Sequence, residues 1–346
     1  MGRGPADLPP APPIAGEGTG RDRPTARCAR AAAGRVWGHA DHDTPAPMSA
    51  VIATRGLTKR FRDHVAVDAL DIEVPQGSVY GFLGPNGSGK STTMKMLLGL
   101  TQPTSGEIHL FGQRLTPATR GGLLPSIGSM IEAPAGYGHL TGWENMRIVR
   151  DMLGLAEAQV ERAFATVRLT QHRDKLVRRY SLGMKQRLGI AMALARDPSL
   201  LVLDEPTNGL DPAGIEEVRS LLMDLAGQGI TVMVSSHLLD EIEKMAGVLG
   251  ILADGRMIFQ GTRAELFEHS IPDLVIETSA PDRAMAEVAG AARSPEGIRL
   301  SARSKDETAD IVRRLVAADV PVHEVRRLPQ SLEDVFMDIT GRGGQL

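Results

Sequence analysis

The spacing of hydrophobic and polar positions divides the chain into stretches of different character. Residues 1–47 are rich in Pro, Ala, Gly and Arg and lack periodicity, so we expect a disordered tail there. Residues 51–270 alternate short apolar runs with helical patterns, which predicts βα units around a largely parallel sheet. Residues 272–346 predict a separate small α+β domain. Because Met48 opens the first patterned segment, we expect it to be the natural first residue and the tail to be an artefact of start-site assignment.

The same patterns predict the individual elements. In the larger domain, the predicted strands are 51–57, 70–74, 78–83, 200–203 and 230–234. A helix is expected at 92–98, and a predominantly helical insert is expected at about 128–190. Within the insert, Thr141 and Glu144 form a capping box that starts one helix, and Ser181 starts another. In the small domain we expect strands 274–277, 298–301 and 320–325 and helices 284–291, 305–318 and 332–339.

A glycine-rich loop joins one predicted strand to the helix that follows. Its residues fit the phosphate-loop pattern of Gly, four residues and Gly-Lys-Ser/Thr: Gly84, Pro85, Asn86, Gly87, Ser88, Gly89, Lys90, Ser91 and Thr92. Glycines let the backbone wrap around an anion, and the helix directs its positive end toward that anion. We therefore expect Lys90 to reach the β- and γ-phosphates of a nucleotide and Ser91 to ligate Mg²⁺. An ordinary glycine-rich turn with an exposed lysine is the alternative.

Two adjacent acids end the apolar run 200–203. Asp204 and Glu205 are costly at the end of a buried strand unless a cation pairs with them, and a metal ion on a nucleotide is the obvious candidate. We expect Asp204 to hold Mg²⁺ through water and Glu205 to polarise the attacking water as general base. A structural ion pair or a helix cap is the alternative.

A histidine follows the predicted strand 230–234 after two serines. A residue just past the end of a parallel strand lies at the carboxyl edge of the sheet, where α/β proteins bind ligands. His237 is therefore expected to donate a hydrogen bond to the γ-phosphate. Lys90, Glu205 and His237 form the predicted catalytic set.

Composition excludes several classes of protein. A net charge of −3 gives no positive electrostatic field that would attract nucleic acid. An aromatic content of 3% gives no platform on which the bases of a single strand could stack. The single cysteine, Cys28, excludes an intramolecular disulfide and fits a reducing compartment. No run approaches the ~18 apolar residues that cross a bilayer, so we expect the chain not to span a membrane by itself.

Taken in order, these motifs resemble the ATPase subunit of an ABC transporter over about residues 51–265. The glycine-rich loop resembles the Walker A motif, LVLDEP the Walker B motif, YSLGMKQ the signature sequence, NGLD with Asp211 the D-loop, and His237 the switch histidine. Phe61 resembles the aromatic residue on which adenine stacks, with a core phenylalanine as the alternative. The resemblance implies a P-loop NTPase fold of ABC type with a helical insert, and ATP and Mg²⁺ as cofactors.

The resemblance also implies partners. Two such domains pair head to tail, here as an expected homodimer, and the signature helix with Ser181 and Gly183 caps the γ-phosphate held by the other copy. The pair would power a separate membrane permease from the cytoplasmic face. We expect the surface of the insert from Pro134 to Trp143, which carries Tyr137 and Trp143, to dock the permease, because exposed aromatic side chains anchor interfaces. Arg187 is expected to have a packing or solvated role, with an arginine finger as the alternative.

Two departures from the family pattern indicate a branch of the family. The signature reads Tyr-Ser-Leu-Gly-Met where the family usually has Leu-Ser-Gly-Gly-Gln. Glu132 stands where the family usually has the Q-loop glutamine, and its carboxylate is a harder Mg²⁺ ligand. Glu132, its neighbouring motifs and the segment 332–336 resemble the bacitracin and lantibiotic-resistance branch, which implies export of a drug or antimicrobial peptide. No residue indicates the cargo.

Two other functions remain open from the sequence. One is a soluble ABC-type ATPase with a regulatory or assembly role. The single phosphate loop and the short distance in sequence between Lys90 and Tyr180 count against the translation and DNA-repair members of this group. The other is a nucleotide-binding switch without turnover, and the presence of Glu205 argues against it.

Overall fold

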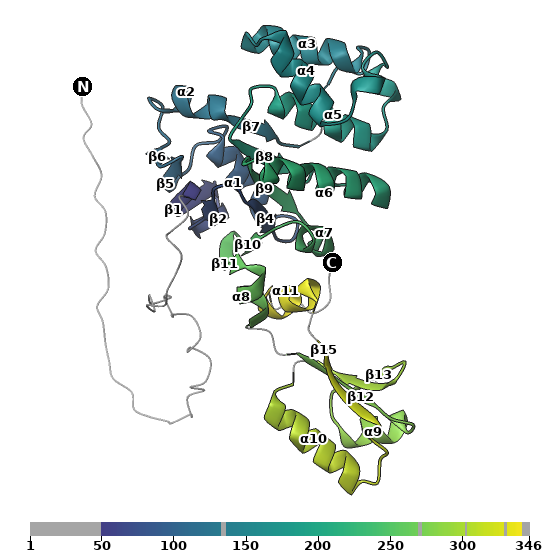
Figure 1. Cartoon of the computed structure of the whole chain (residues 1–346). Coiled ribbons are helices and arrows are strands. Elements are labelled where there is room, and N and C mark those ends of the chain that lie inside the picture. The colour runs from purple at the N-terminus through teal and green to yellow at the C-terminus, as the bar shows by residue number, and fades with distance from the viewer. Residues whose placement is uncertain (1–49, 133–135, 269–271, 302, 329–330, 341–346) are drawn as a thin grey trace, which may run out of the picture. The chain divides into compact units, whose positions relative to one another are not determined.

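The computed structural model describes residues 50–132, 136–268, 272–301, 303–328 and 331–340. The predicted tail and the expected start at Met48 lie outside the described residues. Within the described chain, three sheets and their helices form the fold (Figure 1).

A six-stranded sheet carries the predicted site. Its spatial order is β11 (Arg256–Thr262), β10 (Val248–Ala253), β4 (Val79–Leu83), β9 (Thr231–Ser236), β8 (Leu200–Asp204) and β7 (Ile127–Met130). The strands from β10 to β7 pair in parallel, and β11 adds an antiparallel edge. Because β4, β9 and β8 are neighbours, the motifs that follow these three strands meet at one edge of the sheet.

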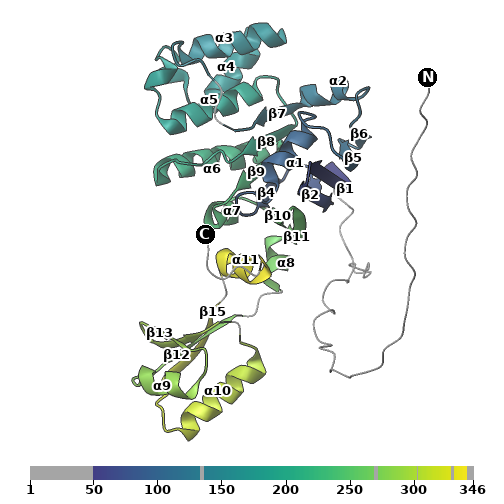
Figure 2. The same cartoon turned by 180° about the vertical axis from the view of Figure 1, so that it is seen from behind.

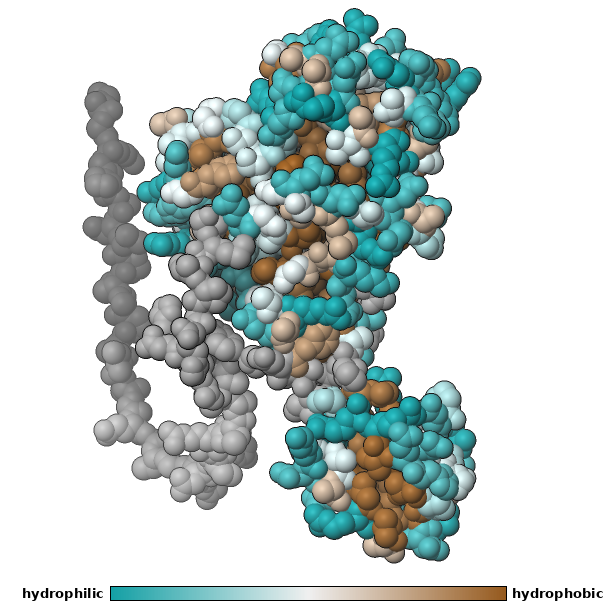
Figure 3. Space-filling model, in the orientation of Figure 1, coloured by the Kyte–Doolittle hydropathy of each residue, from teal (hydrophilic) through white to brown (hydrophobic). Residues whose placement is uncertain are grey.

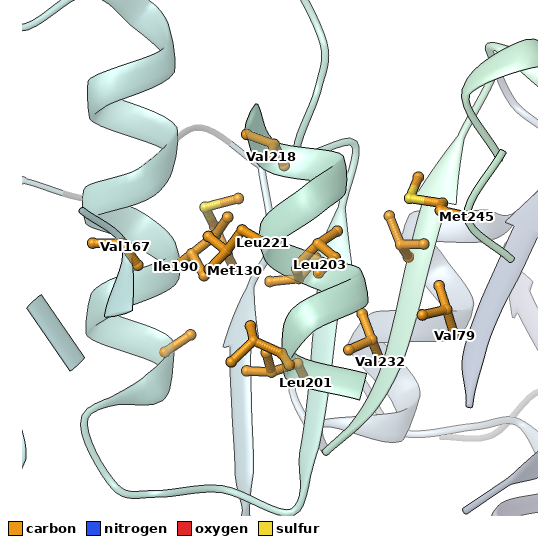
Figure 4. Close-up of a cluster of buried hydrophobic side chains, with 14 of the residues drawn as sticks. Val79, Met130, Val167, Ile190, Leu201, Leu203, Val218, Leu221, Val232 and Met245 are labelled. Atoms are coloured by element: carbon orange, nitrogen blue, oxygen red, sulfur yellow. The ribbon is translucent and has the colours of Figure 1, made fainter. Parts of the chain in front are cut away.

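The two faces of this sheet belong to different parts of the core, as alternation along β8 shows. Leu201 and Leu203 pack with α5 (Leu182–Leu194) and α6 (Pro212–Gly227), and Figure 4 shows both side chains among those of Ile190, Leu221 and Val232. Leu200 and Val202 point the other way and share a cluster with α1 (Lys90–Leu97). The strand is buried at every position, so the acid that ends it has no open solvent around it.

An antiparallel sheet packs into the same cluster as α1. Its order is β2 (His64–Leu70), β1 (Ala50–Phe61), β5 (Ser105–Leu110) and β6 (Gln113–Arg114), and β3 (Glu73–Pro75) also pairs with β1. α2 (Arg120–Leu123) and the 3₁₀ helix Leu124–Ser126 lead from it to β7. The predicted strand 70–74 is wrong, because it spans the junction between β2 and β3.

The helical insert begins later than predicted. β7 belongs to the main sheet, and the insert consists of α3 (Gly142–Leu153), α4 (Glu157–Thr166), the 3₁₀ helices Thr170–His172 and Val177–Arg179, and α5. Figures 1 and 2 both show α3, α4 and α5 together. The predicted capping box is confirmed: Glu144 N donates to Thr141 Oγ1 at 3.1 Å, and Thr141 N donates to Glu144 Oε2 at 2.7 Å.

Residues 273–328 form a small unit with its own core. The elements follow the order β12 (Asp273–Glu277), α9 (Pro281–Glu287), β13 (Ala292–Ser294), β14 (Gly297–Leu300), α10 (Lys305–Ala317) and β15 (Glu324–Leu328). The sheet order β13-β14-β12-β15 makes this a split βαβ arrangement. The strand predicted at 320–325 lies at β15 instead, and β13 was not predicted. Pro321 explains part of the error, because a proline cannot donate to a strand ladder.

The last helix does not join this small unit. α11 (Leu332–Thr340) contributes Leu332, Val335 and Phe336 to the cluster of the six-stranded sheet and contacts α7 (Leu239–Glu243). α8 (Arg263–Glu268) also belongs to this cluster through Leu266. The segment predicted as one accessory domain, 272–346, therefore contains a helix that packs with the larger domain.

Among the described residues, no helix has the length and apolar character to cross a membrane. The face seen in Figure 3 is mainly hydrophilic over the six-stranded sheet and its helices, with hydrophobic residues in small groups.

Candidate nucleotide-binding site

The glycine-rich loop forms an open cradle between β4 and α1. Gly89 is the N-cap of α1 and has a φ of 103°, a left-handed conformation that favours glycine. A Cβ at Gly89 would lie 2.5 Å from the backbone oxygen of Ala66, so a larger residue does not fit. Gly87 has a φ of 83°, also in the left-handed region, and within the described residues its would-be Cβ meets open space. The loop thus has the backbone conformation that the phosphate-loop prediction requires.

Several hydrogen-bond donors of the cradle are unpaired. No side chain caps α1, so the N–H groups of its first turn have no partner within the helix. Within the described residues, Ser88 Oγ is buried and makes no hydrogen bond. Buried polar groups are normally satisfied, and donors that converge on a helix N-terminus suit an anion. The cradle therefore fits the phosphates of a nucleotide.

Lys90 places a buried cation at the cradle. Its side chain is 6% exposed, and Nζ donates to the backbone oxygens of Gly84 at 2.6 Å and Pro85 at 3.2 Å. Burial lowers the pKa of Lys90, while the carboxylates of Glu205 and Asp204 oppose this shift. Nζ lies 3.9 Å from Glu205 Oε1. A phosphate anion would give this ammonium the counter-charge that the two carbonyl oxygens do not supply.

The two acids differ in their surroundings. Asp204 is 6% exposed, and Ser235 Oγ donates to its Oδ1 at 2.6 Å. The same hydroxyl accepts a hydrogen bond from Glu205 N at 2.9 Å. Glu205 has a φ of 48°, a left-handed conformation that costs about 1–3 kcal/mol in a residue other than glycine and is most common at functional sites. Sequence reasoning did not assign Ser235; its signal was a hydroxyl at the end of the strand that neighbours β8.

His237 completes the cluster. It directly follows β9, and its Nδ1 lies 2.6 Å from Glu205 Oε2. The side chain is 31% exposed, so the ring is partly accessible to solvent. Lys90, Asp204, Glu205 and His237 therefore come together from three neighbouring strands.

The signature and D-loop residues have local roles in the structure. Ser181 is the N-cap of α5, where its Oγ accepts from Met184 N at 3.2 Å. Asp211 is the N-cap of α6, where its Oδ1 accepts from Gly214 N at 3.2 Å. Ser181 and Asp211 are exposed, and their recorded hydrogen bonds within the described chain stay in their own helices. The structure does not bring them to the Lys90 cluster.

The other two predicted site residues, Phe61 and Glu132, each contact a lysine side chain in the structure. Phe61 ends β1 with 49% of its surface exposed, and the ammonium of Lys59 lies 4.9 Å from the ring centroid. This excludes the alternative of a core phenylalanine. Glu132 is exposed, and Lys95 Nζ donates to its Oε1 at 2.6 Å. That hydrogen bond is the main cause of a lowered pKa for Glu132.

Arg187 and Trp143 are packed residues. Arg187 contacts the backbone oxygen of Val167 at 3.4 Å and Glu217 at 3.3 Å, as the packing interpretation predicts. Trp143 is half-buried against Phe164, with ring centroids 5.9 Å apart, and Arg173 lies 4.0 Å from its centroid. The expectation that Trp143 is an exposed anchor is therefore wrong, because its neighbours in the insert cover it. Tyr137 is 57% exposed.

The sheet, the cradle and the acid–histidine cluster define a P-loop ATPase. A family model described as ABC transporter matches residues 67–208. The bacitracin transport ATP-binding protein BcrA of Enterococcus faecalis is 44% identical over 225 residues, which cover 64% of this chain and 73% of BcrA. The uncharacterized ABC transporter ATP-binding protein YcbN of Bacillus subtilis (strain 168) is 37% identical over 301 residues, which cover 84% of this chain and 97% of YcbN.

Solved structures agree with this family. The structure of cbiO1 from Clostridium perfringens, part of the ABC transporter complex cbiONQ, has a TM-score of 0.59 and 27% identity, and the match covers 64% of this chain and 91% of cbiO1. This chain belongs to the ATP-binding proteins of ABC transporters, and it binds and hydrolyses ATP. Bacitracin and lantibiotic transport proteins are both among its relatives, which confirms the predicted branch. Proteins of this family are the ATP-binding parts of ABC transporters, and the cassette MJ0796, which has the same fold, has been solved as a dimer.

Proposed function

We propose that this chain powers a separate membrane permease that exports a drug or antimicrobial peptide, and that it binds to the permease at the cytoplasmic face. The contact of Lys90 and His237 with Glu205 beside the glycine cradle carries this proposal, because it places a base next to a phosphate site. Relatives named for bacitracin and lantibiotic transport support an exported peptide antibiotic.

The proposed chemistry follows from the contacts. Lys90 exchanges the carbonyl oxygens of Gly84 and Pro85 for the β- and γ-phosphate oxygens. Glu205 accepts a proton from the attacking water, and its carboxylate holds His237 through Nδ1, which leaves Nε2 to face the γ-phosphate. The exposed ring of Phe61 stacks on adenine.

The side-chain oxygen atoms of Ser91, Asp204 and Glu132 are of the kind that Mg²⁺ prefers as ligands. When bound, Mg²⁺ neutralises charge on the phosphates. Among the described residues, no three His, Cys, Asp or Glu side chains gather into a metal cluster, which suits an ion held largely by phosphate oxygens. We assign Ser91, Asp204 through water, and Glu132 as the protein's ligands. Glu132 has to exchange Lys95 for this role.

The signature residues support a head-to-tail homodimer. The N-terminus of α5 presents Ser181 at the surface, and a helix N-terminus attracts anions. Gly183 lies in the same first turn, and among the described residues outside its own helix its would-be Cβ meets Leu210 Cδ2 at 3.8 Å, an ordinary contact. Nothing in the described chain therefore requires a glycine there. A phosphate held by a second copy of the chain accounts for both features, with Asp211 at the same interface.

Lys90→Met tests the nucleotide site. Burial lowers the pKa of Lys90, so the ammonium opposes folding fully below its folded-state pKa; this cost declines as the pH rises above that value and disappears only above the pKa of the unfolded chain. At neutral pH we therefore expect Lys90→Met without nucleotide to have a Tm at least equal to that of the unaltered protein. ATP should raise the Tm of the unaltered protein and not that of the variant.

Lys305→Met is the matched control, because Lys305 is an exposed residue at the start of α10. It should keep the full ATP-dependent rise in Tm. An equal rise in Lys90→Met would contradict the assignment of Lys90 to the phosphates.

Tyr137 replaces Trp143 as the proposed permease anchor. Tyr137→Ala should weaken binding to the co-expressed permease by roughly 30-fold, as the loss of an interface aromatic does, with no change in Tm. Tyr137→Phe keeps the ring and should bind normally. Trp143→Ala, by contrast, should lower the Tm through lost packing on Phe164. Quantitative co-purification measures the binding, and equal recovery of Tyr137→Ala and Tyr137→Phe would exclude this anchor.

A further inference from the structure

A buried threonine and a buried glutamate connect the segment after β8 with the helix after β9. Thr207 Oγ1 donates a hydrogen bond to Glu241 Oε2, and the two residues are 3% and 8% exposed. Thr207 lies two residues after Glu205, and Glu241 lies four residues after His237, in α7. The contact therefore joins the two segments that carry the proposed base and its histidine.

Stability alone does not explain an acid at this position. In the described part of the chain, Glu241 Oε1 has no hydrogen-bond partner, so Thr207 is the recorded partner of this carboxyl group. A buried carboxyl group with one neutral donor costs free energy. The neighbouring side chains of α7, Leu239 and Ile242, belong to the apolar cluster, where an apolar residue would pack without this cost.

The turn that holds Glu205 depends on outside support. Glu205 has its left-handed φ of 48°, which is unfavourable for a residue with a Cβ. Ser235 Oγ on β9 fixes the backbone N–H of Glu205. Asn208 N donates to Glu205 O at 3.2 Å and closes the turn around Thr207. Ser235 thus holds the start of the turn, and Glu241 holds its middle.

We propose that Thr207 and Glu241 are positioning residues for ATP hydrolysis. Their hydrogen bond fixes the turn that begins at Glu205 to α7, so that the Glu205 carboxylate keeps its orientation toward His237 and the attacking water. The helix that receives the bond is itself held in the core, because α11 packs against it. This inference rests on the proposed role of Glu205 as general base.

Thr207→Val tests the proposal. Valine has the shape of threonine and lacks the hydroxyl, so the turn loses its attachment to α7. We expect kcat for ATP hydrolysis to fall roughly 10- to 100-fold, as small misplacements of a catalytic group do. The KM for ATP and the equilibrium affinity for ATP should stay unchanged, because neither residue belongs to the cradle. Thr207→Ser restores the donor and should restore kcat.

Thr54→Val is the matched control. Thr54 is also 3% exposed, and its hydroxyl donates to Leu70 O at 2.8 Å in the antiparallel sheet. It should lose stability as Thr207→Val does and keep its kcat. If both variants lose kcat in proportion to their loss in Tm, the Thr207 bond is a stability contact only and the proposal fails.

The double variant Thr207→Val/Glu241→Leu separates stability from positioning. Replacing both partners with apolar groups removes the unpaired carboxyl group and should recover most of the lost Tm. The positioning role predicts that kcat stays low in this well-folded variant, whereas full recovery of kcat would overturn it. The double variant also gives an answer if Thr207→Val alone fails to fold.

Failure of this inference is distinguishable from failure of the proposed function. Glu205→Gln is measured in the same assay. If Glu205→Gln turns over normally, the base assignment is wrong whatever Thr207→Val does. If Glu205→Gln is inactive and Thr207→Val has the kcat of the unaltered protein, only the positioning role is wrong.

Discussion

Glu205→Gln should abolish ATP turnover while leaving ATP bound. The change removes the carboxylate that accepts the proton of the attacking water, and loss of a general base lowers rates by roughly 100- to 10,000-fold. The cradle and Lys90 are untouched, and the loss of a negative charge 3.9 Å from Lys90 Nζ favours the anionic nucleotide. Because the bound ATP is not hydrolysed, the ATP-bound dimer of this variant should accumulate.

Phosphate release and size-exclusion chromatography with ATP measure these two effects. Glu157→Gln is the control, because Glu157 is an exposed carboxylate at the start of α4 and pairs with Arg150. It should keep normal turnover and show no extra dimer. Normal turnover in Glu205→Gln would exclude Glu205 as the base, and inactivity without ATP binding would indicate a role in forming the site.

Gly183→Ala should lower ATP turnover without lowering the stability of the folded chain. The added Cβ meets only Leu210 Cδ2, at an ordinary distance of 3.8 Å, and alanine favours helix by up to about 1 kcal/mol over glycine. The variant chain should therefore unfold at an equal or higher temperature. Its methyl group occupies the turn that we propose faces the phosphate of a second copy, so turnover should fall roughly 100-fold, as loss of a charge-stabilising donor does.

Gly227→Ala is the matched control for this substitution. Gly227 ends α6, and nothing lies within 4 Å of its would-be Cβ. It should gain stability in the same way and keep full turnover and ATP-dependent dimerisation. Full activity of Gly183→Ala would show that the first turn of α5 approaches no phosphate.

The sequence predicts that Lys90, Asp204, Glu205 and His237 come together, because each of them follows a strand of the same sheet. The cradle, Lys90 and the acid pair each follow a buried strand, and parallel neighbours bring the ends of such strands to one edge. Ser235 was missed because a serine two residues before a histidine gives no sign that its hydroxyl bonds to Asp204 and to the backbone of Glu205. That arrangement depends on the pairing of β8 with β9, which no local pattern specifies.

The hydrophobic pattern of the sequence also did not predict which aromatic side chains of the insert are exposed. Trp143 lies in the first turn of α3, where a capping box predicts the helix start and says nothing of neighbours. Its burial comes from Phe164 on α4 and from Arg173, both far along the chain. Tyr137 precedes the helix and is 57% exposed, with the ring of His139 beside it. The same limit applies to α11, whose apolar face was predictable and whose partner was not.

The return of α11 to the larger core has a consequence for truncation of the chain around the small βαββαβ unit. The chain leaves the core after α8 and comes back to it with α11, so both ends of the unit are anchored in the same cluster. Along the chain, the unit therefore lies between two helices of the larger core, α8 and α11. Its loss or exchange leaves α7 covered, whereas a stop codon anywhere before Leu332 strips Val335 and Phe336 from the core.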